Sequence, residues 1–91
     1  MNMGDQVKLT RAMLGNDVGT IGYVYEEYPD FDDPAETGVS VIFENGNYDG
    51  FSVWEQENYL EFVRHVPQYQ FYIFQNVNQV TKDYRNGYWS F

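Results

Sequence analysis

The chain has no cysteine among its 91 residues, so neither a disulfide framework nor a thiolate zinc site can stabilise it. Packing of a hydrophobic core must therefore hold the fold together. A chain of this length has room for one modest core, which predicts a single domain over residues 1–91. The lack of disulfides is also typical of proteins in a reducing cytoplasm.

Long hydrophobic runs are absent as well. No apolar stretch is long enough to cross a bilayer, and the opening MNMGDQVKLT lacks the apolar centre of a signal peptide. We therefore expect a soluble, cytoplasmic protein that keeps its own N-terminus and does not contact a membrane.

Positive charge is missing from the middle of the chain. Neither lysine nor arginine occurs between Ala12 and Val63, whereas twelve of the fourteen carboxylates fall in that interval, and the net charge is −9. The electric field of this negative charge repels phosphate backbones and anionic lipids and attracts basic proteins. Direct nucleic-acid binding is therefore disfavoured, and a basic protein or peptide is the expected partner. The alternative is that the acidic surface only keeps the protein soluble.

The sequence also lacks recognisable catalytic motifs. It contains no phosphate-binding glycine loop, zinc-protease helix or G-x-S-x-G elbow, and His65 is the only histidine. A calcium site in the acidic loop is the alternative to a solvated loop, but the EF-hand spacing is absent and Pro34 restricts the backbone there. We expect no enzyme activity, no metal and no cofactor.

The clearest structural signal is a hairpin over residues 39–51, VSVIFENGNYDGF. Val39, Val41 and Phe43 alternate with their neighbours as one apolar face of a strand. Asn45 and Gly46 predict a tight turn in which both residues take positive φ. A second strand then returns the chain, with a kink at Gly50.

The segments before and after this hairpin read mostly as strands. Residues 6–11 alternate with Val7 and Leu9 pointing inward, and residues 18–28 are rich in β-branched and aromatic side chains. Residues 29–38 form an acidic loop with two prolines. We predict a short helical turn over 55–59 and a strand over 60–63, the alternative being one closing strand that includes Trp54.

The last third predicts a strand, a helix and a strand. Residues 69–75 have high β propensity, and Asn76 with Gln79 fits a helix N-cap and capping box. Val77, Val80 and Tyr84 would share one helical face, with Gly87 as the C-terminal cap. A terminal strand over 88–91 follows, and a hairpin turn at residues 85–87 is the alternative to the helix.

Several short motifs resemble a small SH3-like barrel of the KOW or Tudor kind. They are GDQVKL at residues 4–9, GTIGYV at 19–24 as a G-T-x-G-x-V strand, VSVIF at 39–43 with the Asn45-Gly46 turn, and LEFV at 60–63. The resemblance covers residues 4–63 and is to uncharacterised bacterial and phage proteins. It implies a mainly β fold, an SH3-like barrel with a C-terminal strand–helix–strand extension over 67–91. KOW-type modules often bind nucleic acid through basic loops, which this chain lacks.

Aromatic residues are abundant, with nine tyrosines, seven phenylalanines and two tryptophans. We expect some of them to lie at the surface or at an interface, because the core is small and tyrosine and tryptophan are favoured at interfaces. Acids beside aromatics on a barrel rim would attract cationic or proline-containing peptides by charge, cation–π contact and stacking. The candidate binding residues are Tyr25, Tyr28, Asp30, Phe31, Asp32, Asp33, Glu36, Tyr48 and Trp54.

Three functions follow from these features. The leading hypothesis is a non-enzymatic protein-binding module whose acidic, aromatic-rich face docks a basic partner. The second is a phage-type inhibitor that imitates nucleic acid and occupies a nucleic-acid-binding protein. The third is a homo-oligomeric structural protein, suggested by the surplus aromatics and the β-prone residues 69–75 and 88–91.

Overall fold

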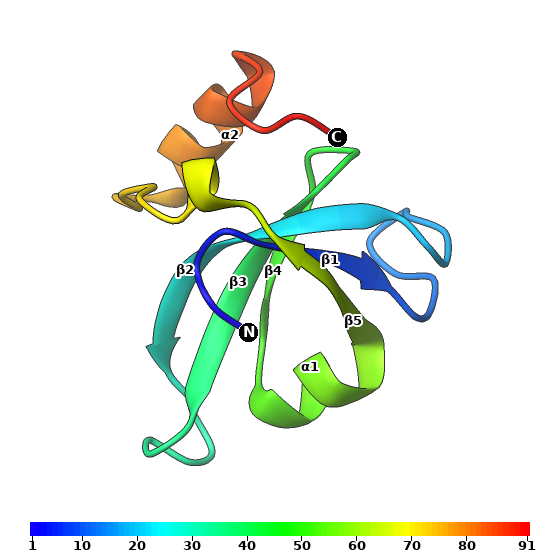
Figure 1. The fold of residues 1–91 in the computed structure, drawn as a ribbon, viewed down its shortest axis with the longest axis vertical. Coiled ribbons are helices and arrows are strands. Elements are labelled where there is room, and N and C mark those ends of the chain that lie inside the picture. Colours follow the sequence, from blue (N-terminus) through cyan, green and yellow to red (C-terminus); the bar gives the residue numbers. More distant parts are fainter.

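The computed structural model describes residues 1–91 and is mainly β, with one five-stranded antiparallel sheet and two helices (Figure 1). The strands are β1 (Asp5–Leu9), β2 (Ile21–Pro29), β3 (Thr37–Phe43), β4 (Tyr48–Phe51) and β5 (Leu60–His65). They lie in the order β4-β3-β2-β1-β5. Helix α1 (Val53–Tyr59) links β4 to β5, and a 3₁₀ turn, η1 (Pro67–Tyr69), precedes helix α2 (Val77–Arg85). Neither helix has the length and apolar character needed to cross a bilayer.

The predicted hairpin is confirmed, but its turn differs from the prediction. The loop between the strands is closed by hydrogen bonds from Phe43 N–H to the Asn47 carbonyl and from Gly46 N–H to the Phe43 carbonyl, both 2.9 Å. Gly46 has a φ of +87°, whereas Asn45 does not enter the left-handed region. The Asn45 side chain instead accepts the Asn47 N–H and donates to the Leu14 carbonyl. This loop is therefore the longer hairpin type with one left-handed glycine.

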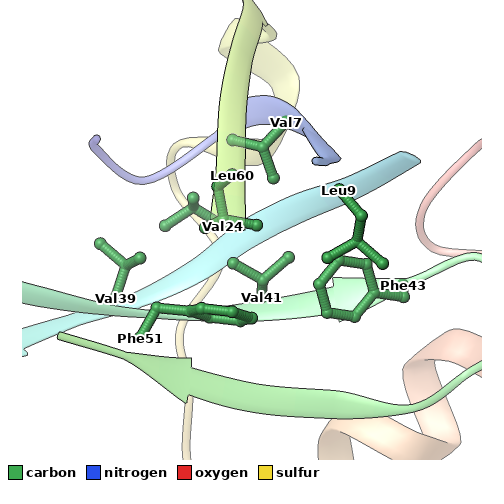
Figure 2. Packing of buried hydrophobic residues seen from close by; sticks show 8 residues of the cluster. All are labelled: Val7, Leu9, Val24, Val39, Val41, Phe43, Phe51 and Leu60. Carbon is green, nitrogen blue, oxygen red and sulfur yellow. The ribbon is translucent and has the colours of Figure 1, made fainter. Parts of the chain in front are cut away.

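The sheet is buried on both faces, so it separates two hydrophobic clusters. The first core contains Val7, Leu9, Val24, Val39, Val41, Phe43, Phe51 and Leu60 (Figure 2). The second core contains Tyr23, Tyr25, Ile42, Val66, Tyr69, Tyr72, Val80 and Trp89. Alternation along β3 explains the division, because successive side chains point to opposite faces of a strand. The prediction of one apolar face on β3 was therefore incomplete: Ile42 is as fully buried as its neighbours.

The sheet is not closed into a barrel. Strands β4 and β5 lie at its two ends and do not pair with each other. Helix α1 connects them, and its buried Gln56 donates from Nε2 to the carbonyls of Thr37 and Phe51, at 2.9 and 3.1 Å. The Gln56 side chain therefore connects α1 to β3 and β4, on one side of the gap between the end strands β4 and β5. The predicted helical turn and the strand that follows it are both confirmed, and both are slightly longer than predicted.

The C-terminal helix, its N-cap and its C-terminal glycine are confirmed, but the predicted capping box is not formed, because only the Asn76 side chain bonds to the backbone there. The Asn76 side chain accepts the Gln79 N–H at 2.9 Å, and Gly87 takes a φ of +77° just beyond the last turn. Val80 is completely buried against the second core. Val77 lies exposed, so the predicted apolar face is narrower than the spacing suggested.

The two strands predicted beside this helix were wrong. Residues 69–75 begin in η1, pass through a turn at residues 70–71 and continue without regular secondary structure, and residues 88–91 are irregular. Side-chain hydrogen bonds hold the chain end where a strand ladder was expected: Ser90 N–H donates to the Tyr69 hydroxyl at 2.8 Å, and the Tyr23 hydroxyl donates to the Ser90 carbonyl. Aromatic packing also holds the C-terminal end in place, because Trp89 lies against Tyr25 and Tyr72.

Replacing Gln56 with alanine should destabilise the protein. Two carbonyls at the open side of the sheet would lose their donor, and leaving buried polar groups unpaired costs about 1–3 kcal/mol. Urea unfolding of Gln56→Ala should show that loss. Glu57→Ala, at the exposed neighbouring position of the same helix, is the control and should change stability by less than about 0.5 kcal/mol. Equal effects of the two substitutions would contradict this role of Gln56.

His65 links three segments at the end of β5. Its Nδ1 lies 2.8 Å from Asp5 Oδ1, and its Nε2 lies 2.8 Å from Gln70 Oε1. The hydrogen bond to Asp5, followed by that to Gln70, raises the pKa of His65 above 6.5. Protonated histidine donates from both nitrogens and so suits two oxygen partners.

Stability should therefore depend on the protonation of His65. Because its pKa is higher in the folded state, the stabilisation is complete below pH 6.5 and is lost as the pH rises through the folded pKa. Urea unfolding across this range should show wild-type stability falling relative to that of His65→Gln. Parallel pH profiles for the two proteins would rule out the contribution.

Candidate functional site

An acidic groove of about 510 Å³ lies between the residues that follow β2 and the first turn of α1. No lysine or arginine lines it. The residues that line it, here called the acidic groove, are Tyr28, Asp30, Phe31, Asp32, Gly50, Ser52, Trp54, Glu55 and Tyr59.

Tyr28 forms one wall of the groove because two glycines leave room for its ring. A Cβ atom at Gly38 would lie 2.5 Å from the ring, and one at Gly50 would lie 2.5 Å from the hydroxyl. The ring therefore lies directly over the backbone of β3 and β4. Its hydroxyl donates to the Val39 carbonyl at 3.2 Å, and burial raises its pKa, so the phenol stays neutral.

Asp30 is the unusual residue of the groove. Only 5% of its surface is exposed, yet its carboxylate accepts no hydrogen bond from the protein and forms no ion pair. The chain has two ion pairs, and both lie elsewhere, at Glu61 with Lys8 and at Asp5 with His65. The carboxylate oxygens of Asp30 are not completely buried, and Asp30 lines the groove, so a ligand would reach them through the groove. Buried carboxylates are normally paired, and Asp30 has neither a cation nor a hydrogen-bond donor within the chain.

The acidic loop is folded tightly enough to fix Asp30 in place. Asp30 N–H donates to the Glu36 carbonyl and Glu36 N–H donates to the Asp33 carbonyl, both at 2.9 Å. The Asp33 side chain accepts the Ala35 N–H at 3.1 Å, which is a local turn bond typical of aspartate. Phe31, beside Asp30, is 95% exposed.

The opposite wall is the start of α1. Ser52 Oγ accepts the Glu55 N–H at 3.2 Å, and Glu55 Oε1 accepts the Ser52 N–H at 3.0 Å, which is a complete capping box. This arrangement presents Trp54 in the first turn, 60% exposed and packed edge-on against Tyr59 at 5.5 Å between ring centres. The Arg11 guanidinium lies 4.9 Å from the Tyr59 ring centre and covers one face of it.

Five of the nine candidate residues come together in the groove: Tyr28, Asp30, Phe31, Asp32 and Trp54. The sequence interpretation missed Gly50, Ser52, Glu55 and Tyr59. The S-V-W-E spacing at residues 52–55 is a capping-box signature, and it would have started the helix two residues earlier and placed Glu55 beside Trp54.

The other four candidates lie outside the groove. Tyr25 is buried in the second core, with its ring 5.7 Å from that of Phe74, so its expected exposure was wrong. Tyr48 is exposed on β4, paired with Ile42 in the sheet. Asp33 is held in the turn of the loop, and Glu36 lines a separate hollow with Met1 and Gln56.

Comparison with protein-family models, with curated proteins and with solved structures finds no match to this chain. No three histidine, cysteine, aspartate or glutamate side chains come together as a possible metal site.

The capping box predicts how two substitutions at the groove wall will differ. Ser52→Ala removes the cap and should lower stability by about 1 kcal/mol. Glu55→Gln removes one charge from the groove but keeps an acceptor for the Ser52 N–H, because glutamine also serves in capping boxes. Thermal unfolding should therefore show a clear loss for Ser52→Ala and almost none for Glu55→Gln. Similar melting curves for Ser52→Ala and the wild type would contradict this account of the wall.

Proposed function

We propose that this protein is a non-enzymatic binding module whose acidic groove docks a basic partner protein by receiving one of its cationic side chains. The observation that carries the proposal is Asp30, a carboxylate that is 95% buried, unpaired and at the groove. Asp32 and Glu55 add negative charge to the same lining. An incoming lysine or arginine would supply the missing partner.

The aromatic residues of the groove suit the same ligand. A cation over an aromatic face gains about 0.5–2 kcal/mol, and a charge-assisted hydrogen bond to a carboxylate is roughly twice as strong as a neutral one. Tyr28 and Trp54 stand beside Asp30 in the lining, so both contacts are available to one side chain. Arginine fits best, because its planar guanidinium can stack on a ring while it donates two parallel hydrogen bonds to a carboxylate.

We also propose that the sheet is an open relative of the SH3-like barrel. Supporting this are five antiparallel strands and a short helix immediately before the last of them. The groove then lies at the open side of the sheet, where β4 is followed by α1. Fold alone says little about function, so the binding proposal depends on the groove residues.

Binding should depend on Asp30 more than on net charge. With a short fluorescein-labelled Gly-Arg repeat peptide as the probe, Asp30→Asn should weaken the affinity measured by fluorescence anisotropy by about tenfold or more, since a buried charge pair is lost. Asp17→Asn, an exposed site in another loop, makes the same change in net charge and should alter affinity by less than about twofold.

Salt provides the second readout of this experiment. Affinity for the Gly-Arg peptide should fall as ionic strength rises, because screening weakens the attraction between charges. Equal losses in Asp30→Asn and Asp17→Asn would mean diffuse attraction to an acidic surface and would overturn the groove proposal. Affinity that is unaffected by salt would do the same.

A further inference from the structure

A second hollow, of about 320 Å³, lies where the C-terminal segment meets β2. The residues that line it, here called the β2 hollow, are Met3, Tyr25, Glu26, Glu27, Tyr72 and Phe74. Three of them are aromatic and two are acidic, and no lysine or arginine is among them. The β2 hollow therefore combines the same two kinds of side chain as the acidic groove.

Both carboxylates of the β2 hollow are held in place without a cation. Glu26 Oε1 accepts the Ser40 hydroxyl at 2.9 Å, and Glu27 Oε2 accepts the Met3 N–H at 2.8 Å. Neither glutamate takes part in an ion pair, so each has a second oxygen to offer a ligand. Glu26 is half-buried, and solvent screens a half-buried charge less than an exposed one.

The aromatic side of the β2 hollow is fixed by the second core. The Tyr25 ring lies edge-on to that of Tyr72 at 6.3 Å between ring centres, and the Phe74 ring lies 5.7 Å from that of Tyr25. The Tyr72 hydroxyl donates to Asp83 Oδ2 at 2.7 Å, which fixes the second ring. Rings beside carboxylates suit a guanidinium, which can stack on a ring and donate to a carboxylate at once.

The β2 hollow and the acidic groove share one face of the sheet. Glu26 pairs with Ser40 and Tyr28 pairs with Gly38, two residues further along both strands, so their side chains point to the same face. The contacts agree, because Ser40 bonds to Glu26 and the Tyr28 ring lies over Gly38. An extended chain rises about 3.3 Å per residue, which separates the Cα atoms of Glu26 and Asp30 by about 13 Å.

We propose that the basic partner presents an extended segment with two arginines four residues apart, one in the acidic groove and the other in the β2 hollow. This inference rests on the proposed function, which supplies the first arginine at Asp30. Residues i and i+4 of an extended peptide point to the same side about 13 Å apart, which matches the separation of Glu26 from Asp30. A second copy of this chain, with its net charge of −9, would bring like charge to both sites.

Two fluorescein-labelled peptides of equal charge test the spacing by fluorescence anisotropy, Gly-Arg-Gly-Gly-Gly-Arg-Gly and Gly-Gly-Arg-Arg-Gly-Gly-Gly. The spaced peptide should bind at least about fivefold more tightly, because its second contact is effectively intramolecular, whereas adjacent arginines point to opposite sides. Glu26→Gln should remove most of this advantage and leave affinity for the adjacent peptide within about twofold. Glutamine still accepts the Ser40 hydroxyl, so the variant should keep its fold.

The control is Glu44→Gln, which makes the same change in net charge at an exposed loop position and should leave both affinities within about twofold. Asp30→Asn should weaken binding of both peptides. If it does so while wild-type protein binds the two peptides equally, or while Glu26→Gln behaves like Glu44→Gln, the second arginine site is overturned and the groove proposal stands. If Asp30→Asn also behaves like Glu44→Gln, both proposals are overturned.

Discussion

Burial of β3 on both faces is the constraint on which the rest of the structure depends. Val39, Val41 and Phe43 fill the first core, and Ile42 contributes to the second. A strand buried in this way needs cover on each side, which the curled sheet with α1 supplies for one face and the C-terminal segment for the other. Aromatic residues dominate the contact between the sheet and this second cover, where Tyr23 and Tyr25 of β2 pack with Tyr69, Tyr72 and Trp89.

The acidic groove follows from how the sheet ends. Strand β2 extends beyond its pairing with β1 and ends opposite the start of β3, and Asp30, the next residue, lies beside the point where β4 is followed by α1. Two glycines let Tyr28 lie against the backbone there, and the capping box fixes the direction in which Trp54 is presented. The groove walls are therefore fixed by the two glycines and the capping box, whereas the Asp30 carboxylate in the groove has no partner within the chain.

Local signals in the sequence predicted the strands, the hairpin and α2, because alternation, caps and turn residues act over a few positions. Asn76 and Gly87 are clear examples. The strand predictions over 69–75 and 88–91 were wrong because no strand lies alongside these residues to pair with them, despite their high β propensity. Side-chain contacts to Tyr23 and Tyr25 determine the path of the chain there instead. The burial of Asp30 and of Tyr25 depends on contacts with distant segments of the chain, which short sequence patterns do not predict.

The two tryptophans offer the most direct test of the central claim, that the acidic groove receives a cationic side chain. Trp54 lines the groove and Trp89 is buried in the second core. In a two-dimensional ¹⁵N NMR titration with an arginine-containing peptide, the indole N–H of Trp54 should shift progressively while that of Trp89 stays in place. An unmoved Trp54 signal beside shifts elsewhere on the surface would contradict the account.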